Sequence, residues 1–305
     1  MKPHETPLFH HNNVAVKMEA LQPGGSHKAR AARRMIREAL VAGHLSKGGG
    51  RRIIEKSGGN LGVGLAFEAQ RHGIAVDLVI GLSFSPLKRR LCQHFGANLI
   101  GENLLRAGFT PKQAITHLMK QDPDRWFFTD QFINPANLNA HLEETGPELV
   151  RQVAAIRQPG QGIILVKGAG TGASFEGISR CLRDAFGAVR CELVVPSGCD
   201  IAANVFVDHP LEGFAVGVRP PFLDLGYINA VHQIAPDVAM EGQAAMARHI
   251  GFFPGMTSGA NYAAALSAAA RHPNALIVTL AYDSGESYIR AAADPAPPTP
   301  QPAHV

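Results

Sequence analysis

The chain has 305 residues, of which 46% are hydrophobic and 18% charged, and this is enough for a large core shared between two lobes. The formal net charge of +4 comes from scattered lysines and arginines, so nucleic-acid binding is not expected. Residues 1–11 are polar and no apolar run could span a bilayer, so we expect neither a signal peptide nor a membrane span. Four cysteines without a C-x-x-C pair fit a reducing cytoplasm.

Expected strands and helices alternate along the chain, which predicts an α/β fold with two lobes, each a largely parallel sheet flanked by helices. Residues 162–166 are continuously apolar, as in a strand buried on both faces. The expected strands are 14–21, 52–55, 76–80, 98–100, 126–129, 162–166, 192–195 and 276–280. The expected helices are 27–42, 61–72, 86–95, 111–120, 146–155, 175–186 and 261–271, with a further helical stretch around residue 137.

Domain boundaries follow from the same pattern. We expect an N-terminal lobe over residues 1–140, whose smaller and mobile part is about 76–130. A C-terminal lobe covers 141–292, and the proline-rich residues 293–305 are expected to be disordered.

Two groups of charged residues outside the loops need an interpretation. Arg30, Arg33, Arg34 and Arg37 fall on one helical face, which is either a solvated face or a surface that attracts an anionic substrate or partner. Residues 10 and 11 are adjacent histidines without a third ligand nearby, so we interpret them as loop histidines and expect no metal site.

Four loops lie at junctions between strands and helices, where open α/β sheets bind ligands. In the first, residues 24–28, Lys28 stands in the first turn of a helix, where the helix dipole disfavours a cation. A positive local field and burial lower the pKa of a lysine, which Schiff-base chemistry requires. Taken alone, this residue is more simply explained as a surface lysine.

The second loop, residues 57–62, holds three glycines, which allow close approach to a ligand, and Asn60 offers both a donor and an acceptor. The third, residues 168–174, follows a buried strand and opens a helix, so its N–H groups could cradle a phosphate. It lacks the lysine of a P-loop and the acidic residue that reads a nicotinamide ribose. The fourth, residues 255–261, has two hydroxyl residues that could be simple helix caps.

In this order, these segments resemble those of the cysteine synthase family, the type II fold of pyridoxal-phosphate (PLP) enzymes with PLP in the cleft between two lobes. The resemblance runs from about residue 14 to residue 289. The similar segments are KMEALQPGGSHKAR, EKSGGNLGVGLA, LKRRLCQHFGANLI, DQFINPANLNAHLEETGPEL, GTGASFEGISRCL, MTSGAN and DSGESY.

The resemblance implies a role for individual residues. Lys28 would form the Schiff base and later act as acid and base, Asn60 would contact the ring hydroxyl of PLP, and Thr257 would face its pyridine nitrogen. Gln131 would lie near the substrate carboxylate. The phosphate would be held by Gly170, Thr171, Gly172, Ala173 and Ser174, and the substrate by the loop with Ser57, Gly58, Gly59 and Leu61.

Three departures from the family pattern stand out. Ala29 replaces the aspartate that usually follows the lysine. Gly58 and Leu61 replace two hydroxyl residues that normally bind the substrate carboxylate, and each hydrogen bond to a charged group contributes about 1.5–3 kcal/mol. The glycine loop expected after the strand ending at Pro196 is not evident, and residues 217–221 stand in roughly that region. We therefore hypothesise an unusual substrate rather than that of the housekeeping cysteine synthase.

The activity implied is PLP-dependent β-replacement on a serine-type amino acid, such as O-acetylserine or O-phosphoserine, through an aminoacrylate. A β-elimination lyase or deaminase is the alternative on the same scaffold. A non-catalytic PLP-binding paralogue is a third hypothesis, against which the intact Lys28 argues. By resemblance we also expect a homodimer with a small amino-acid substrate as ligand.

Overall fold

The computed structural model describes residues 4–82 and 86–289, which form two compact units. Among these residues, unit 1 comprises 4–35 with 131–286, and unit 2 comprises 36–82 and 86–130 with 287–289. These units are not contiguous in sequence, unlike the lobes expected on either side of residue 140, because the first strands pair with the last one. The tail expected to be disordered, 293–305, lies outside the described residues.

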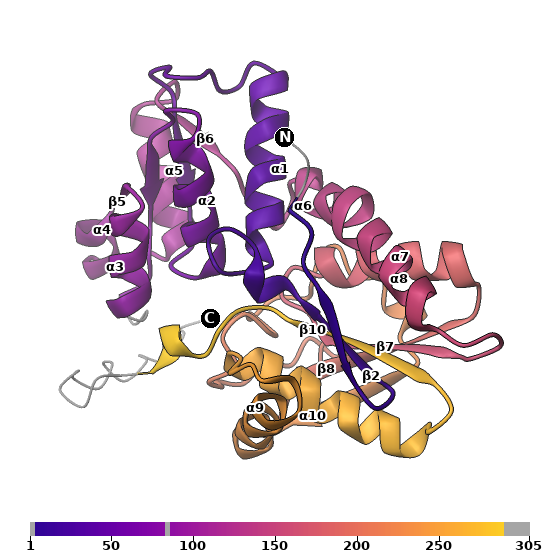
Figure 1. Ribbon diagram of the computed structural model, residues 1–305. Helices are drawn as coiled ribbons and strands as arrows, with labels where there is room; N and C mark the ends of the chain where they lie inside the picture. The colour runs from indigo at the N-terminus through magenta and orange to yellow at the C-terminus, as the bar shows by residue number, and fades with distance from the viewer. Residues whose placement is uncertain (1–3, 83–85, 290–305) are drawn as a thin grey trace. The chain divides into compact units, whose positions relative to one another are not determined.

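Unit 1 is built on a six-stranded sheet in the order β1-β2-β10-β7-β8-β9 (Figure 1). Only the β1–β2 pair is antiparallel, and every residue of β7 and β10 is buried, as the continuous apolar runs predict. The strands are β1 Leu8–His11, β2 Val14–Met18, β7 Ile163–Gly168, β8 Val189–Pro196, β9 Ala230–Ile234 and β10 Leu276–Ala281.

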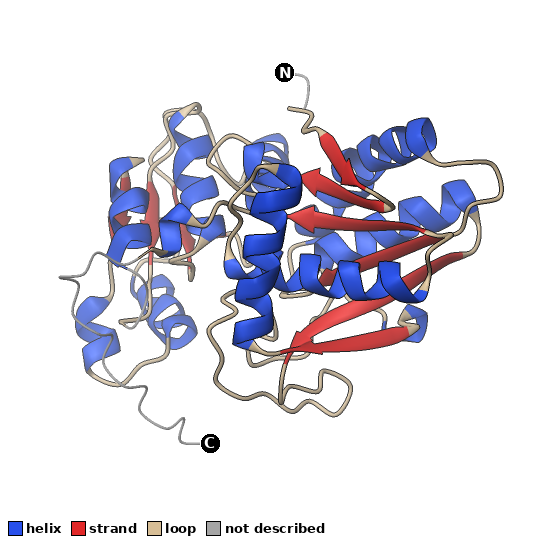
Figure 2. Cartoon of the chain, turned by 60° about the horizontal axis from the view of Figure 1, so that its bottom comes forward, coloured by secondary structure: helices blue, strands red, loops and turns tan. Residues whose placement is uncertain are grey.

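Helices cover both faces of this sheet, with α7 and α8 on one side and α9 and α10 on the other (Figures 1 and 2). Helices α9 and α10 pack closely because Gly242 and Gly259 face each other. A Cβ added at Gly242 would lie 2.1 Å from the Gly259 carbonyl oxygen. The helices are α1 Lys28–Val41, α6 Pro135–Ala140, α7 Gly146–Ile156, α8 Ala173–Phe186, α9 Pro236–Ile250 and α10 Met256–Arg271, with the short turns η1 Glu19–Leu21, η2 His141–Thr145, η3 Leu225–Tyr227 and η4 Glu286–Tyr288.

Unit 2 is a smaller parallel sheet with the strand order β5-β4-β3-β6. Helix α5 begins as the sequence predicts: Thr110 caps it in a reciprocal capping box with Gln113, and Pro111 is its first residue. The elements are β3 Arg52–Glu55, α2 Asn60–Gln70, β4 Val76–Leu78, α3 Pro86–His94, β5 Ala97–Leu99, α4 Glu102–Arg106, α5 Pro111–Gln121 and β6 Trp126–Phe128. The two largely parallel sheets confirm the predicted α/β class.

Several element boundaries differ from the prediction. Strand β2 ends at Met18, and the chain then turns so that the Gln22 amide bonds to the Glu19 carbonyl at 3.2 Å. The two histidines expected in a loop belong to β1, and His11 stacks on His249 with ring centroids 4.1 Å apart. Helix α10 begins at Met256, not at residue 261, so the hydroxyl residues of the fourth loop lie in its first turn.

The arginine face of α1 is not a solvated face. Arg30 has a fully buried side chain that bonds to Glu19 at 2.7 and 2.8 Å and pairs with Glu148 at 2.8 Å. Arg33 and Arg34 pair with two carboxylates of η2, Glu144 and Glu143 respectively, and only Arg37 is exposed. Three of the four charges are neutralised within unit 1, so most of this face is not available to attract an anion.

Candidate active site

Lys28 is the first residue of α1 and follows a turn in which Gly24 and Gly25 adopt positive φ angles of 84° and 78°. Only glycine adopts these angles without strain. The His27 amide donates to the Tyr282 carbonyl at 3.0 Å, so the turn is fixed to the end of the neighbouring strand β10. Lys28 is half-buried there, at the carboxyl edge of the six-stranded sheet.

A chain of hydrogen bonds joins Lys28 to the phosphate loop, by which we mean residues 168–174. The Lys28 Nζ donates to Gln131 Oε1 at 3.1 Å. The buried Asn137 donates through Nδ2 to the Gln131 carbonyl at 2.8 Å and to Thr171 Oγ1 at 3.2 Å. The structure therefore brings together three of the residues singled out in the sequence, and Asn137 is the residue that connects them.

The phosphate loop runs from the end of β7 to the start of α8, which Gly172 precedes with φ +88°. A side chain is excluded at Gly170 and Gly172, because an added Cβ would lie 2.4 Å from the Gly213 carbonyl oxygen or 2.6 Å from the Leu223 nitrogen. The loop thus presents backbone N–H groups at the positive end of a helix, together with the hydroxyls of Thr171 and Ser174. This donor set fits a phosphate.

The segment 211–223 packs against this loop. The Ala215 amide donates to the Ala169 carbonyl at 3.2 Å, and the Phe222 amide donates to the Thr171 carbonyl at 3.1 Å. The ring of Phe214 occupies the space over Gly168, where an added Cβ would lie 2.1 Å from it. The region in which the sequence lacks a family-like glycine loop therefore forms one wall of the phosphate loop.

Thr257 lies in the first turn of α10 and is 6% exposed. The same turn is fixed to the sheet, since Ser258 Oγ accepts from the Tyr282 amide at 2.8 Å. One turn further on, Asn261 Oδ1 accepts from the Gly168 amide at 2.8 Å. Helix α10 thus connects Thr257 rigidly to the start of the phosphate loop, although its predicted contact with a pyridine nitrogen stays a prediction.

The asparagine loop, residues 57–62, belongs to unit 2 and opens α2. Ser57 Oγ accepts from the Gly62 amide at 3.2 Å, and Leu61 is only 1% exposed. The Leu61 side chain is therefore part of the core, and only its backbone could meet a substrate. Lys88 of α3, which is 2% exposed, donates to Asn60 Oδ1 at 3.4 Å.

Lys167 is a second lysine at the phosphate loop, and the sequence analysis missed it. It stands in β7, is fully buried, and donates to Ser174 Oγ at 2.9 Å and to the Gly168 carbonyl at 3.2 Å. A lone lysine in an otherwise apolar strand that leads directly into a glycine loop is the signal that could have identified it.

Basic side chains lie close to one another around Lys28. Burial, followed by the nearby charges of Lys28 and Lys167, holds the pKa of His141 well below its usual range. Neutral His141 Nδ1 lies 2.9 Å from Thr145 Oγ1. A region with two lysines and a neutral histidine suits an anionic ligand.

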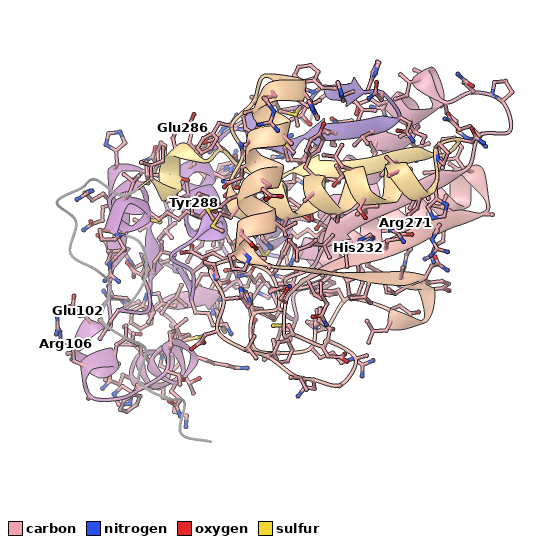
Figure 3. The ribbon with its side chains drawn as sticks, turned by 90° about the horizontal axis from the view of Figure 1, so that it is seen from below. Glu102, Arg106, His232, Arg271, Glu286 and Tyr288 are labelled. Carbon is pink, nitrogen blue, oxygen red and sulfur yellow. The ribbon has the colours of Figure 1, made fainter. Side chains whose placement is uncertain are left out.

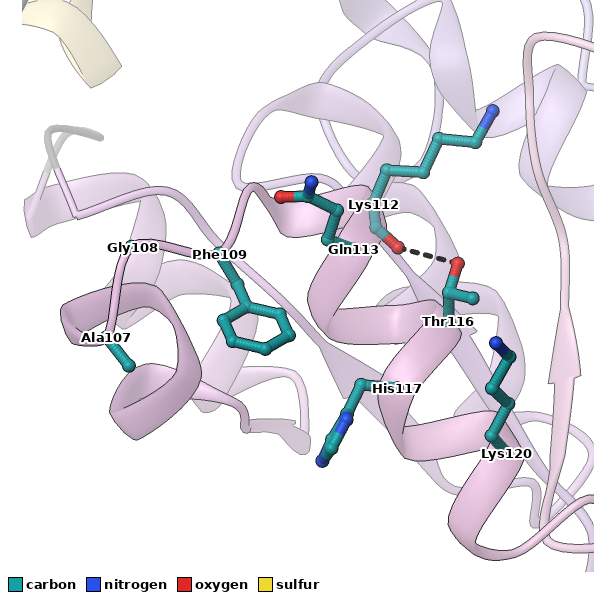
Figure 4. A pocket seen from close by; sticks show the side chains of 8 residues that line it. All are labelled: Ala107, Gly108, Phe109, Lys112, Gln113, Thr116, His117 and Lys120. Atoms are coloured by element: carbon teal, nitrogen blue, oxygen red, sulfur yellow. Dashed lines mark hydrogen bonds between the residues drawn. The ribbon is translucent and has the colours of Figure 1, made fainter. Parts of the chain in front are cut away.

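Two other regions carry polar side chains, but none of the predicted site residues lies in them. Figure 3 shows His232 and Arg271 close together, and both contact the buried Glu192, at 2.6 and 3.2 Å. Burial opposes the ionisation of Glu192, but bonds from Arg190 and His232 outweigh it and lower its pKa, so these residues form an ion cluster. Figure 4 shows an open hollow beside α5 that none of the predicted site residues lines.

Within residues 4–82 and 86–289, no cluster of three or more histidines, cysteines or acidic residues could hold a metal ion. No helix in that part of the chain is long and apolar enough to cross a membrane.

Comparison with known proteins agrees with this geometry. Residues 2–283 match the model of the family described as pyridoxal-phosphate dependent enzyme. The cysteine synthase of Haemophilus influenzae is 31% identical over 296 residues, covering 93% of this chain and 90% of the relative. The O-ureido-L-serine synthase of Streptomyces lavendulae is 30% identical over 290 residues, covering 92% and 84%.

Solved structures agree as well. A crystal structure of O-ureido-L-serine synthase has a TM-score of 0.83 at 28% identity, covering 94% of this chain and 91% of that one. The O-acetylserine dependent cystathionine beta-synthase from Helicobacter pylori has a TM-score of 0.81 at 28% identity, covering 94% of each chain. With a lysine joined to a phosphate loop and relatives that match along nearly its whole length, this chain belongs to the family of pyridoxal-phosphate-dependent enzymes that includes the cysteine synthases.

Proposed function

We propose that the protein catalyses β-replacement on a serine-type amino acid, such as O-acetylserine or O-phosphoserine, giving cysteine or another β-substituted alanine. The observation that carries this proposal is the hydrogen-bonded path from Lys28 through Gln131 and Asn137 to Thr171. The matched relatives named cysteine synthase and O-ureido-L-serine synthase support the same reaction type.

The residues present fit the cofactor. Lys28 would attach it covalently, Asn60 and Thr257 would contact its ring, and the loop at Gly170–Ser174 would hold its phosphate. Pyridoxal phosphate, when bound, supplies the electron withdrawal that weakens the bond to the α-hydrogen of the amino acid. Binding and orientation are the contribution of the chain.

Lys28 also serves as the proton carrier. Its ε-amino group, when it is not bonded to the cofactor, would accept the α-proton of the amino acid and later return it. Gln131 Oε1, at 3.1 Å from Nζ, orients this amine by accepting one of its hydrogens. A neutral acceptor is suited to this task, because a carboxylate would hold Lys28 in its protonated form.

The substrate carboxylate would be bound at the asparagine loop of unit 2. Ser57 can donate its hydroxyl hydrogen, because the bond from the Gly62 amide uses only a lone pair of Oγ. Gly58, Gly59 and Leu61 offer backbone groups, since the Leu61 side chain is buried. Lys88 adds a buried ammonium group beside Asn60. We also assign Gln131 to the substrate, as the resemblance implies.

Product analysis tests the proposal. The enzyme is incubated with O-acetylserine, O-phosphoserine or serine, with and without sulfide, and the products are identified by mass spectrometry. We expect a β-substituted alanine that Lys28→Ala does not form and that the exposed-lysine control Lys47→Ala forms at the wild-type rate. Pyruvate and ammonia as the main products would establish the lyase instead, and no turnover of any donor would favour a non-catalytic paralogue.

The same assay tests the hypothesis of an unusual substrate. Efficient cysteine formation from O-acetylserine and sulfide would refute that hypothesis while supporting β-replacement. The homodimer and the cytoplasmic location stay predictions. Sedimentation equilibrium would measure the mass of the protein in solution and so test the homodimer.

A further inference from the structure

Lys167 is a buried cation that the proposed mechanism does not use. Its side chain is fully buried in β7, and its Nζ lies 2.9 Å from Ser174 Oγ in the first turn of α8. Its other hydrogen-bond partner is the Gly168 carbonyl at 3.2 Å. Both partners belong to the phosphate loop, so the amine lies directly behind the cradle that the loop forms.

No carboxylate among the residues that the structure describes pairs with Lys167. The rings of Phe175 and Tyr282 lie over the amine at 5.3 and 5.4 Å, which offers an ammonium group only partial stabilisation. The titratable and charged groups around it are Lys28 of the α1 turn, His27, His141 of η2 and the Tyr282 phenol, and none of them is an anion at neutral pH.

A comparison with Lys17 shows what is missing. Lys17 is equally buried but pairs with Glu148, whereas Lys167 has only neutral partners. Burial and the charge of Lys28 hold the pKa of Lys167 well below its usual range. An ammonium group in such a place requires an anion, and an anionic ligand at the phosphate loop would supply it.

We propose that Lys167 is the counter-ion of the cofactor phosphate, and that it takes up a proton from solvent as the phosphate binds. In this view the amine is neutral before the ligand arrives, and one proton moves from the buffer to Nζ on binding. Lys167 therefore makes cofactor affinity depend on the phosphate charge, in addition to the N–H groups and hydroxyls of the loop.

Pyridoxine 5′-phosphate and pyridoxine are the probes for this proposal, because neither has an aldehyde that could react with Lys28. At pH 8 the phosphate is a dianion, since its second pKa is about 6. Titration calorimetry of the apoprotein in buffers of different ionisation enthalpy measures the protons taken up per ligand. We expect about one proton for the phosphate-bearing ligand in the wild type.

The variant Lys167→Met keeps the length and apolar stem of the side chain but removes the amine. It should take up no proton at this site and should bind pyridoxine 5′-phosphate about 10- to 100-fold more weakly, as expected for one lost charged hydrogen bond. Its affinity for pyridoxine should remain that of the wild type. Its apoprotein should melt at the wild-type temperature or above, because a desolvated amine has been removed.

Three outcomes would overturn the proposal: an unchanged proton uptake in Lys167→Met, an equal loss of affinity for both ligands, or a large fall in the melting temperature of the apoprotein. The last two would show that Lys167 shapes the fold and does not act as a counter-ion. The inference depends on cofactor binding alone, so a failure of the proposed β-replacement in the product assay would leave it standing.

Discussion

Glu55 provides a quantitative test of the structure of unit 2. It is the last residue of β3, is fully buried, and precedes the asparagine loop. Its Oε2 accepts from Thr129 Oγ1 at 2.6 Å and its Oε1 accepts from the Lys56 amide at 2.9 Å. Burial raises the pKa of this carboxyl to about 7, although both hydrogen bonds oppose the shift.

The raised pKa makes the stability of unit 2 depend on pH. Below pH 4.5, the ordinary pKa of glutamate, Glu55 is protonated in both the folded and the unfolded chain. Between pH 4.5 and about 7 only the unfolded chain loses this proton, so the free energy of unfolding falls as the pH rises. Above about pH 7 the loss is complete and amounts to about 3 kcal/mol.

Trp126, the single tryptophan of the chain, reports on this unit. It is buried in β6 of the same sheet, and its Nε1 donates to Asp77 Oδ2 at 2.7 Å, so its fluorescence should change when unit 2 unfolds. Denaturant titrations from pH 5 to 8 then compare wild type with Glu55→Gln. As the pH rises from 5 to 8, the free energy of unfolding of Glu55→Gln minus that of the wild type should increase by about 2–3 kcal/mol.

A surface carboxylate serves as the control. Glu102 is exposed and bonds to Arg106 at 2.7 Å within α4 (Figure 3), so Glu102→Gln should follow the wild-type pH dependence from pH 5 to 8. If Glu55→Gln also followed the wild-type curve, Glu55 would be ionised throughout this range, and the reasoning from its burial would be refuted.

Three further predictions concern other sites. Borohydride reduction and peptide mass spectrometry should find the cofactor on Lys28, and a label on Lys167 would contradict the assignment. Lys88→Met should raise the KM for the amino acid about tenfold or more, with a smaller change in kcat. Lys88→Arg should restore part of the lost affinity. An unchanged KM in Lys88→Met would exclude Lys88 from carboxylate binding. Arg30→Met should lower the free energy of unfolding by about 3–5 kcal/mol, because the carboxylates of Glu19 and Glu148 stay buried without their guanidinium partner. Denaturant titrations followed by circular dichroism measure this free energy. A loss below about 1 kcal/mol would contradict the prediction.

The sequence predicts best those elements whose signal is local. Strand β7 and the cap of α5 follow from an apolar run and from the pair Thr110 and Pro111, which depend on no distant residue. Strand β9 was missed because it is an edge strand in which exposed and half-buried residues alternate over only five positions. The preceding strand β8 was predicted only in part, since Arg190 interrupts its apolar run.

Residues of the site that resemble a family segment, such as Lys28 and Gln131, could be predicted, whereas the contacts between segments could not. The glycines of the phosphate loop lie close together in sequence, so the sequence alone indicates that they form one binding loop. Asn137 connects Gln131 with Thr171 across more than thirty residues, and only tertiary packing reveals it. The arginine face of α1 was misread for the same reason, because the carboxylates that neutralise it lie far away in the chain.

Residues 58 and 61 differ from the cysteine synthase family pattern, and the structure suggests a reason that the sequence alone does not. Leu61 contributes to the core of unit 2, so its side chain provides packing and no hydrogen bond to a substrate. Two hydrogen bonds to a carboxylate would contribute about 3–6 kcal/mol together. A single buried ammonium can replace much of this, because a charge pair is stronger where water is excluded. Lys88 lies in such an environment beside Asn60, which is why we propose it, and not the side chains at positions 58 and 61, as the group that binds the substrate carboxylate.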